Sequence, residues 1–173
     1  MNSEVLLEPF NIPEFDPPTT LFQVLTTSTA RFRENIAYIY NAGEEECQVT
    51  YGKVFEDVLL LSRAFRRRGI AKGDRVVLLS DNRYAWMVTD LAIMSLGAVI
   101  VPRGSDTPAP ELEYIVEQSG SSFIVLETGE LLEEHGEYLK KCKQLKDIFV
   151  ITGPERNSLF GNTYSYADLL ADR

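Results

Sequence analysis

The sequence is poor in the residues from which disulfides and metal sites are built. It holds two cysteines, Cys47 and Cys142, which lie far apart in the chain, and one histidine, His135, which stands among glutamates. A metal site needs more ligands at a suitable spacing, so no metal ligand is expected and His135 is predicted to lie on the surface. Because the N-terminus lacks a secretory signal, both cysteines are expected to be reduced thiols in a cytoplasmic protein.

Excess positive charge and long apolar runs are also absent. The formal net charge is −9, which argues against nucleic-acid binding because contacts to phosphate need a basic face. Arginines do gather at residues 63–68, and we interpret them as the solvated C-terminal end of a helix, which favours cations. No stretch of about 18 or more residues is free of polar groups, so no transmembrane segment is expected.

Three sequence motifs for phosphate and acyl chemistry are missing as well. The sequence has no Gly-x-Gly-x-x-Gly after a strand, no Gly-x-x-x-x-Gly-Lys-Ser/Thr and no Gly-x-Ser-x-Gly. Their absence excludes the dinucleotide fingerprint, the phosphate loop and the nucleophile elbow, respectively. A Ser-His-Asp relay would have to use His135, which stands in a charged segment. No catalytic residue is therefore predicted in this chain.

What the sequence does have is a regular series of buried β-prone runs. They begin near residues 76, 98, 123 and 148, and each gap of about 22 to 25 residues leaves room for one helix. This spacing predicts an α/β fold with a mainly parallel sheet of at least four strands, covered by helices on both faces. The segment 73–103 is its centre, with a buried strand, a helix at 83–96 that is apolar on most sides, and a second buried strand.

The rest of the chain is expected to surround this unit. The segment 1–18 carries four prolines and little periodicity, which is typical of an extended segment. We expect an extended arm (1–18) followed by a single domain (19–173). Before the central unit, this domain should hold a helix (20–33), a small β-hairpin (37–40 and 47–50) and a helix capped by Thr50 (50–69). After the central unit, we expect helices at 108–120, 129–145 and 165–171 and a loop at 157–162.

Short polar side chains mark the expected starts of two helices. Ser80, Asp81 and Asn82 follow the first buried strand and can cap the next helix, so Asn82 is interpreted as a cap. Thr107 is predicted as an N-cap, with Pro108 at the first helical position. In parallel sheets ligands lie beyond the carboxyl ends of the strands, so a site is expected in the loops that follow the strands.

Three stretches together resemble one known family. VTYGKVFEDV at 49–58, the segment 66–120 and RFRENIAYIY at 31–40 are similar to the N-terminal part of AMP-forming acyl-CoA synthetases, which belong to the adenylate-forming superfamily. The shared features are the Thr-Tyr helix start, the Gly-Ile-x-x-Gly-Asp-x-Val turn and the Gly-Ala-Val-x-Val-Pro strand. Val-Pro-Arg-Gly-Ser-Asp-Thr at the end of that strand looks like the long-chain fatty acyl-CoA ligase branch. The resemblance covers about residues 20–151.

The resemblance implies a reaction in which ATP and a fatty acid form an acyl-adenylate and pyrophosphate, after which CoA takes the acyl group and AMP leaves. Magnesium accompanies the ATP. In the family, the groups that donate hydrogen bonds and positive charge to the phosphates lie in a Ser/Thr/Gly-rich loop that ends in lysine and in later motifs. None of these motifs occurs in residues 1–173. We therefore expect an N-terminal piece of such a ligase, inactive alone and without bound ATP, magnesium or CoA. Its partner would be the rest of the same enzyme, and an exposed apolar patch would make the piece self-associate.

Arg103, Ser105 and Asp106 are the candidate site residues, because they stand where the second strand of the central unit ends. In the intact enzyme they would lie near the substrate or CoA; alternatively they form a capped turn in which Arg103 pairs with a neighbouring carboxylate. Trp86 and Phe123 are predicted to be core residues and not ligand contacts. Two other functions stay open: an AMP-forming ligase for an aryl, amino or short-chain acid, and a stand-alone α/β interaction module without catalysis.

Overall fold

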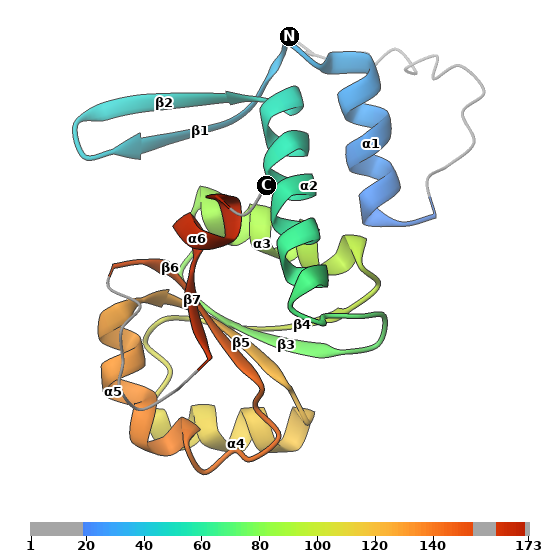
Figure 1. Cartoon of the computed structure of the whole chain (residues 1–173). Helices are drawn as coiled ribbons and strands as arrows, with labels where there is room; N and C mark the ends of the chain where they lie inside the picture. Colours follow the sequence, from blue (N-terminus) through green and yellow to red (C-terminus); the bar gives the residue numbers. More distant parts are fainter. Residues whose placement is uncertain (1–18, 154–161, 172–173) are drawn as a thin grey trace, which may run out of the picture.

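The computed structural model describes residues 19–153 and 162–171, so the arm predicted at 1–18 and most of the loop at 157–162 lie outside the described residues. Within them, helices and strands alternate along most of the chain (Figure 1). In chain order the elements are α1 (Leu21–Phe32), β1 (Ile36–Ala42), β2 (Glu45–Thr50), α2 (Tyr51–Arg67), β3 (Arg75–Leu79), α3 (Tyr84–Ser95), β4 (Val99–Arg103), α4 (Ala109–Ser119), β5 (Phe123–Thr128), α5 (Gly129–Leu139), β6 (Asp147–Thr152), β7 (Thr163–Ser165) and α6 (Tyr166–Ala171).

The centre of the fold is a parallel sheet of five strands in the order β4-β3-β5-β6-β7. This confirms the predicted α/β fold, and β1 and β2 form the predicted antiparallel hairpin as a separate two-stranded sheet. The strand β7 was not predicted. It is only three residues long, and a run that short has no periodicity by which it could be recognised.

Helices cover both faces of the five-stranded sheet, as predicted. On one face α2, α3 and α6 share a core with the alternate side chains Val76 and Leu78 of β3, and α1 lies outside them against α2 and α3. On the other face α4 and α5 pack on Val77 and Leu79. Successive strand residues point to opposite faces, so a run of apolar residues without polar interruptions gives β3 two buried sides.

The central unit is less buried than predicted at its second strand. β4 pairs with β3 alone within the described residues and is therefore an edge strand, and Val99 at its start is 51% exposed. The helix α3 buries fully only one stripe, which includes Val88, Ala92 and Ile93, and its other residues are partly exposed. The prediction of two strands buried on both sides was correct for β3 and wrong for β4.

The helix caps predicted for α3 and α4 were wrong, whereas Thr20 caps α1 as expected for Thr19 or Thr20. Thr50 does cap α2, where its Oγ1 accepts the backbone N–H of Lys53 at 3.2 Å. The N-cap of α3 is Arg83 instead of one of the three preceding polar residues, so Asn82 is not a cap. The N-cap of α4 is Pro108, and the Thr107 hydroxyl instead donates to the carbonyl of Gly104.

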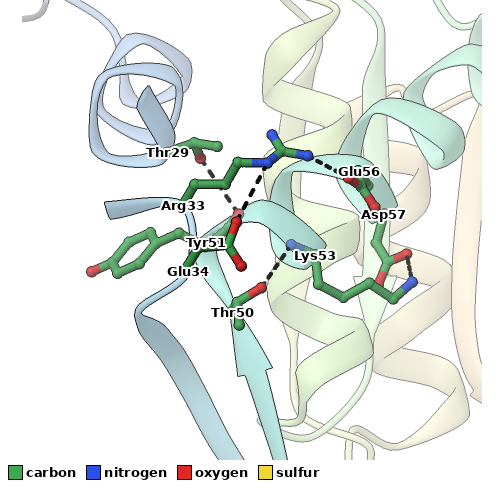
Figure 2. A network of polar contacts seen from close by, with 8 residues as sticks. All are labelled: Thr29, Arg33, Glu34, Thr50, Tyr51, Lys53, Glu56 and Asp57. Atoms are coloured by element: carbon green, nitrogen blue, oxygen red, sulfur yellow. Dashed lines mark hydrogen bonds and ion pairs between the residues drawn. The ribbon is translucent and has the colours of Figure 1, made fainter. Parts of the chain in front are cut away.

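Polar contacts join α1 to the start of α2 (Figure 2). Arg33, which ends α1, donates from Nη2 to Glu56 Oε1 at 2.7 Å, and the Thr29 hydroxyl donates to the carbonyl of Tyr51 at 3.4 Å. The N–H of Gly52 also donates to the Arg33 carbonyl at 2.9 Å. These bonds hold the first turn of α2 against α1 and so fix the base from which the hairpin extends.

The histidine is buried, contrary to the surface position predicted for it. His135 is 1% exposed and lies on the inner stripe of α5 with Leu132 and Leu139. Neither ring nitrogen has a hydrogen-bond partner among the described residues. The charged neighbours in sequence lie on the outer face of the helix, because α5 turns about 100° per residue. The helix also ends at Leu139, earlier than the predicted residue 145.

Cys47 is half-buried, Cys142 is buried, and both are free thiols. Among the described residues, no helix is both long enough and apolar enough to cross a membrane.

Candidate functional site

The strand order places the reversal of the crossover connections between β3 and β5. The chain passes from β3 outward to β4 over one face of the sheet, and from β4 back to β5 over the other. In open α/β sheets ligands bind beyond the carboxyl ends of the strands at the point of such a reversal. Leu79 of β3 pairs with both Arg103 of β4 and Leu126 of β5. The next residues, Ser80 and Glu127, therefore stand at the same level where this reversal lies.

Glu127 is the centre of a polar network at these strand ends. Its Oε2 accepts the backbone N–H of Asp81 at 2.7 Å and the Ser80 hydroxyl at 3.1 Å. Its Oε1 accepts a guanidinium N–H of Arg83 at 2.8 Å, and the two side chains form an ion pair. The side chain of Glu127 is 18% exposed, so the carboxylate is mostly shielded and its oxygens have partners.

A second contact links the strand ends of β3 and β4. The backbone N–H of Ser105 donates to Asp81 Oδ1 at 3.2 Å. The hydrogen bonds from Ser105, aided by the positive charge of Arg83, lower the pKa of the Asp81 carboxyl from its usual value. Asp81 is therefore ionised at neutral pH and ties the loop after β4 to the loop after β3.

A hollow of about 300 Å³ opens above this pair of loops. Arg103 is exposed at its rim and donates to the carbonyl of Pro102 at 2.7 Å. It forms no ion pair with a carboxylate of the described residues, so the predicted alternative of a paired Arg103 is not observed. A Cβ added at Gly104 would lie 2.8 Å from Asp106 Oδ1, so a larger residue there would require the exposed Asp106 side chain to move. The hollow is lined by Ser80, Asp81, Asn82, Trp86, Pro102, Arg103 and Gly104.

The structure brings the three predicted site residues into one loop. Arg103 lines the hollow, Ser105 bonds to Asp81, and Asp106 lies against Gly104. Phe123 is a core residue at 1% exposure, as predicted. Trp86 is only partly buried and also lines the hollow, so its prediction as a plain core residue was incomplete.

Sequence reasoning did not single out Glu127, although its position carried a signal. It follows the apolar run of β5 at the point where the neighbouring strands also end. An acidic residue at that place, close to the reversal of strand order, is a candidate for contact with the other strand ends. The strand order itself was needed to show which ends are neighbours.

A second hollow, of about 390 Å³, lies between the hairpin and the start of α3. Its aromatic wall is one cluster, since the rings of Tyr40 and Tyr84 are stacked 5.6 Å apart and Tyr38 lies within 6.1 Å of each. The Tyr84 hydroxyl donates to Asp57 at 2.8 Å. The hollow is lined by Tyr38, Tyr40, Asn41, Ala42, Asn82, Arg83, Tyr84, Ala85, Ile151 and Thr152.

The arrangement at the strand ends suits the binding of an anionic group. Arg103 offers unpaired guanidinium donors, which match phosphate and carboxylate oxygens, and Trp86 adds an apolar wall. The described residues contain no group of three or more side chains suited to hold a metal ion. The site can therefore bind and orient a ligand, and no side chain in it is arranged as an activated nucleophile.

Two relatives of known name cover large parts of the chain. A chloroplastic long-chain-fatty-acid–[acyl-carrier-protein] ligase of Arabidopsis thaliana is 27% identical over 149 residues, which is 83% of this chain and 20% of that ligase. A long-chain-fatty-acid–CoA ligase of Mycobacterium tuberculosis is 31% identical over 91 residues, which is 53% of this chain and 15% of that enzyme. The chain thus spans a fifth or less of the length of these two relatives.

Solved structures of acid ligases share the fold. Coronafacic acid ligase from Pectobacterium brasiliense matches with a TM-score of 0.78 and 18% identity, over 88% of this chain and 29% of that one. An anthranilate CoA ligase in complex with anthranoyl-AMP matches with a TM-score of 0.78 and 20% identity, over 91% and 29%. The family described as AMP-binding enzyme matches residues 25–168, which include every strand of the sheet. The chain therefore belongs to the AMP-binding enzyme family.

Proposed function

We propose that this chain is the N-terminal part of a ligase that activates a long-chain fatty acid with ATP and then transfers the acyl group to CoA. The observation that carries the proposal is the family match over residues 25–168. The choice of acid is supported by the Val-Pro-Arg-Gly-Ser-Asp-Thr segment and by two relatives named as long-chain-fatty-acid ligases. Relatives and solved structures named for 4-hydroxybutyrate and anthranilate keep other acids as the alternative.

The loop of Arg103, Ser105 and Asp106 would face the substrate or CoA in the intact enzyme. The phosphates of CoA fit the unpaired guanidinium of Arg103, because planar N–H donors match phosphate oxygens. ATP and magnesium do not fit the residues present: the sequence has no phosphate loop, and the described residues have no cluster of three metal ligands. Those groups would be held by downstream parts of the same enzyme, which are the proposed partner.

ATP–pyrophosphate exchange by the purified chain tests the proposal. The chain alone is expected to show no exchange with fatty acids of any length, because the loop and lysine that bind the phosphates are missing from its sequence. Measurable exchange would contradict this expectation. The coding sequence after codon 173 provides a second test. A Ser/Thr/Gly-rich loop that ends in lysine is expected there, and its absence would favour a stand-alone interaction module.

Acid preference is tested on the longer polypeptide. Exchange rates with palmitate, 4-hydroxybutyrate and anthranilate at matched concentrations should be highest with palmitate. A higher rate with either of the other acids would retain the ligase and reject the long-chain substrate. The proposed location is the cytoplasm, which the two free thiols support; chloroplastic and mitochondrial relatives make organelles the alternative, and fractionation of cells decides between them.

A further inference from the structure

The carboxylate of Glu127 lies where a sheet of this strand order usually receives a ligand. The reversal of direction falls between β3 and β5, and ligands of such sheets bind beyond the strand ends at that point. Here both oxygens of Glu127 are bonded to the chain itself: Oε2 accepts from Ser80 and Asp81, and Oε1 accepts from Arg83. The carboxylate is thus occupied by contacts within the chain, and Glu127 is not among the residues that line the open hollow.

Through Asp81, the contacts of Glu127 reach the loop after β4. The N–H of Asp81 donates to Glu127, while Asp81 Oδ1 accepts the N–H of Ser105. Hydrogen bonds to a carboxylate are stronger than those between neutral groups, so each link holds the next in place. The ends of β5, β3 and β4 are joined in series, although Glu127 and Ser105 share no hydrogen bond within the described part of the chain.

The same carboxylate decides which cation is available to a ligand. Arg83 is held at 2.8 Å by Glu127, whereas Arg103 bonds only to the carbonyl of its neighbour Pro102. Of the residues that line the strand-end hollow, Arg103 alone is cationic. An anion that enters the hollow would therefore meet Arg103, while Arg83 stays neutralised by its partner.

We infer that Glu127 is a positioning residue, which sets the geometry of the loops after β3 and β4 and keeps Arg83 out of the hollow. The inference rests on the proposed function in one respect, namely that the hollow receives an anionic ligand. Glu127 itself contacts no ligand and supplies no chemistry. Its effect on Ser105 passes through Asp81. A change at Ser105 on loss of Glu127 therefore indicates a positioning role, whereas a purely local role would affect only the direct partners of Glu127.

Amide hydrogen exchange of the whole chain, followed by NMR, tests the relay. Glu127→Met removes both oxygens and keeps a side chain of similar length. The amides of Asp81 and Ser105 are expected to exchange about tenfold faster or more, while amides of α2 and β6 keep their rates. Glu127→Gln retains one oxygen and should give intermediate rates. If the methionine variant fails to fold, the exchange rates of Asp81 and Ser105 in Glu127→Gln test the inference instead.

Glu113→Gln is the matched control, since Glu113 is also a partly buried glutamate in an ion pair, with Lys141 on the far face of the sheet. It should leave the exchange of Asp81 and Ser105 unchanged. Unchanged exchange at Ser105 in both Glu127 variants would overturn the inference. Equal acceleration of all core amides would do so too, because it indicates a general loss of stability. Neither result depends on catalysis, so the inference and the proposed function can fail separately.

Discussion

At the scale of single residues, charge pairing distinguishes two arginines that follow neighbouring strands. Arg83 forms an ion pair with Glu127, while Arg103 is exposed at the rim of the hollow. A guanidinium that is already bonded to a carboxylate attracts an anionic ligand less than an unpaired one, since its charge is neutralised. The free arginine is therefore the residue whose loss should change ligand binding.

Replacing Arg103 with glutamine in the longer polypeptide is expected to lower kcat/KM for CoA by about tenfold or more, because one charge-assisted hydrogen bond is lost. The ATP–pyrophosphate exchange rate should not change, since it precedes the CoA step. Arg63→Gln, an exposed arginine of α2, is the control and should leave both rates as they are. A normal CoA dependence in the Arg103 variant would retire its proposed role.

The buried histidine makes the stability of the folded protein depend on pH. Burial lowers the pKa of His135 from its usual value, and the nearby charge of Glu134 opposes this shift only in part. In the unfolded chain the ring titrates near pH 6.5. The unfolded state therefore binds more protons below that pH, and stability falls as the pH drops.

Urea denaturation of the wild type and of His135→Leu at about pH 7 and about pH 5 measures how much His135 contributes to the pH dependence of the free energy of unfolding. The wild type should lose up to about 1.4 kcal/mol per pH unit more than the variant below pH 6.5, until the pKa of the folded protein is reached. Burial raises the pKa of Asp90 and Asp147 in both proteins, so their effects cancel in the comparison. Glu133→Gln, at an exposed position of the same helix, is the control. Equal losses in wild type and leucine variant would contradict the prediction.

At the scale of elements, the packing of α2 on the sheet depends on an aromatic cluster. Phe65 of α2 is fully buried, with its ring centroid 5.0 Å from that of Phe149 in β6 and 6.4 Å from that of Tyr166 in α6. The ring thus joins α2 to a strand and a helix that lie far from it in the sequence. Removing it leaves a cavity that these elements cannot close without moving.

Phe65→Ala is expected to lower the free energy of unfolding by about 3–5 kcal/mol, the usual cost of deleting a buried aromatic ring. Phe65→Leu should cost clearly less, because most of the volume is kept. Chemical denaturation followed by circular dichroism measures both values, and an unchanged slope would show that the unfolded state is the same. A loss below about 1 kcal/mol in the alanine variant would show that this contact contributes little.

At the scale of the whole molecule, α1 leaves a row of apolar side chains largely exposed beside its buried stripe. Its side chains Leu21, Val24 and Phe32 are 59%, 43% and 43% exposed, while Leu25 and Thr29, which follow them around the helix, are buried. Large exposed apolar patches mark places where another surface packs. The predicted self-association of the chain would use this row.

Sedimentation of the chain over a range of concentrations tests that prediction. The average mass should rise with concentration, and the double change Leu21→Ser and Val24→Ser should restore a monomer because it removes the exposed apolar area. Ala30→Ser, an exposed position on the same helix, is the control and should behave as the wild type. A monomer at every concentration in the wild type would contradict self-association and favour the stand-alone module.

The sequence by itself determined the parallel sheet and most helices of this protein. Apolar runs without polar interruptions, separated by room for one helix, leave few alternatives to βαβ units. Local signals were also sufficient for the cap at Thr50 and for the end of α4 at Gly120, whose φ of 62° suits glycine. Such features depend on residues a few positions apart, which a sequence displays directly.

Only the tertiary structure decided which residues are covered and which strand ends are neighbours. Burial of His135 and exposure of Val99 follow from the position of α5 against the sheet and of β4 at its edge. The meeting of Glu127, Asp81 and Ser105 requires the strand order β4-β3-β5. That order arises from hydrogen bonds between segments that are separated by a whole helix or more along the chain, and local propensity does not encode such pairings.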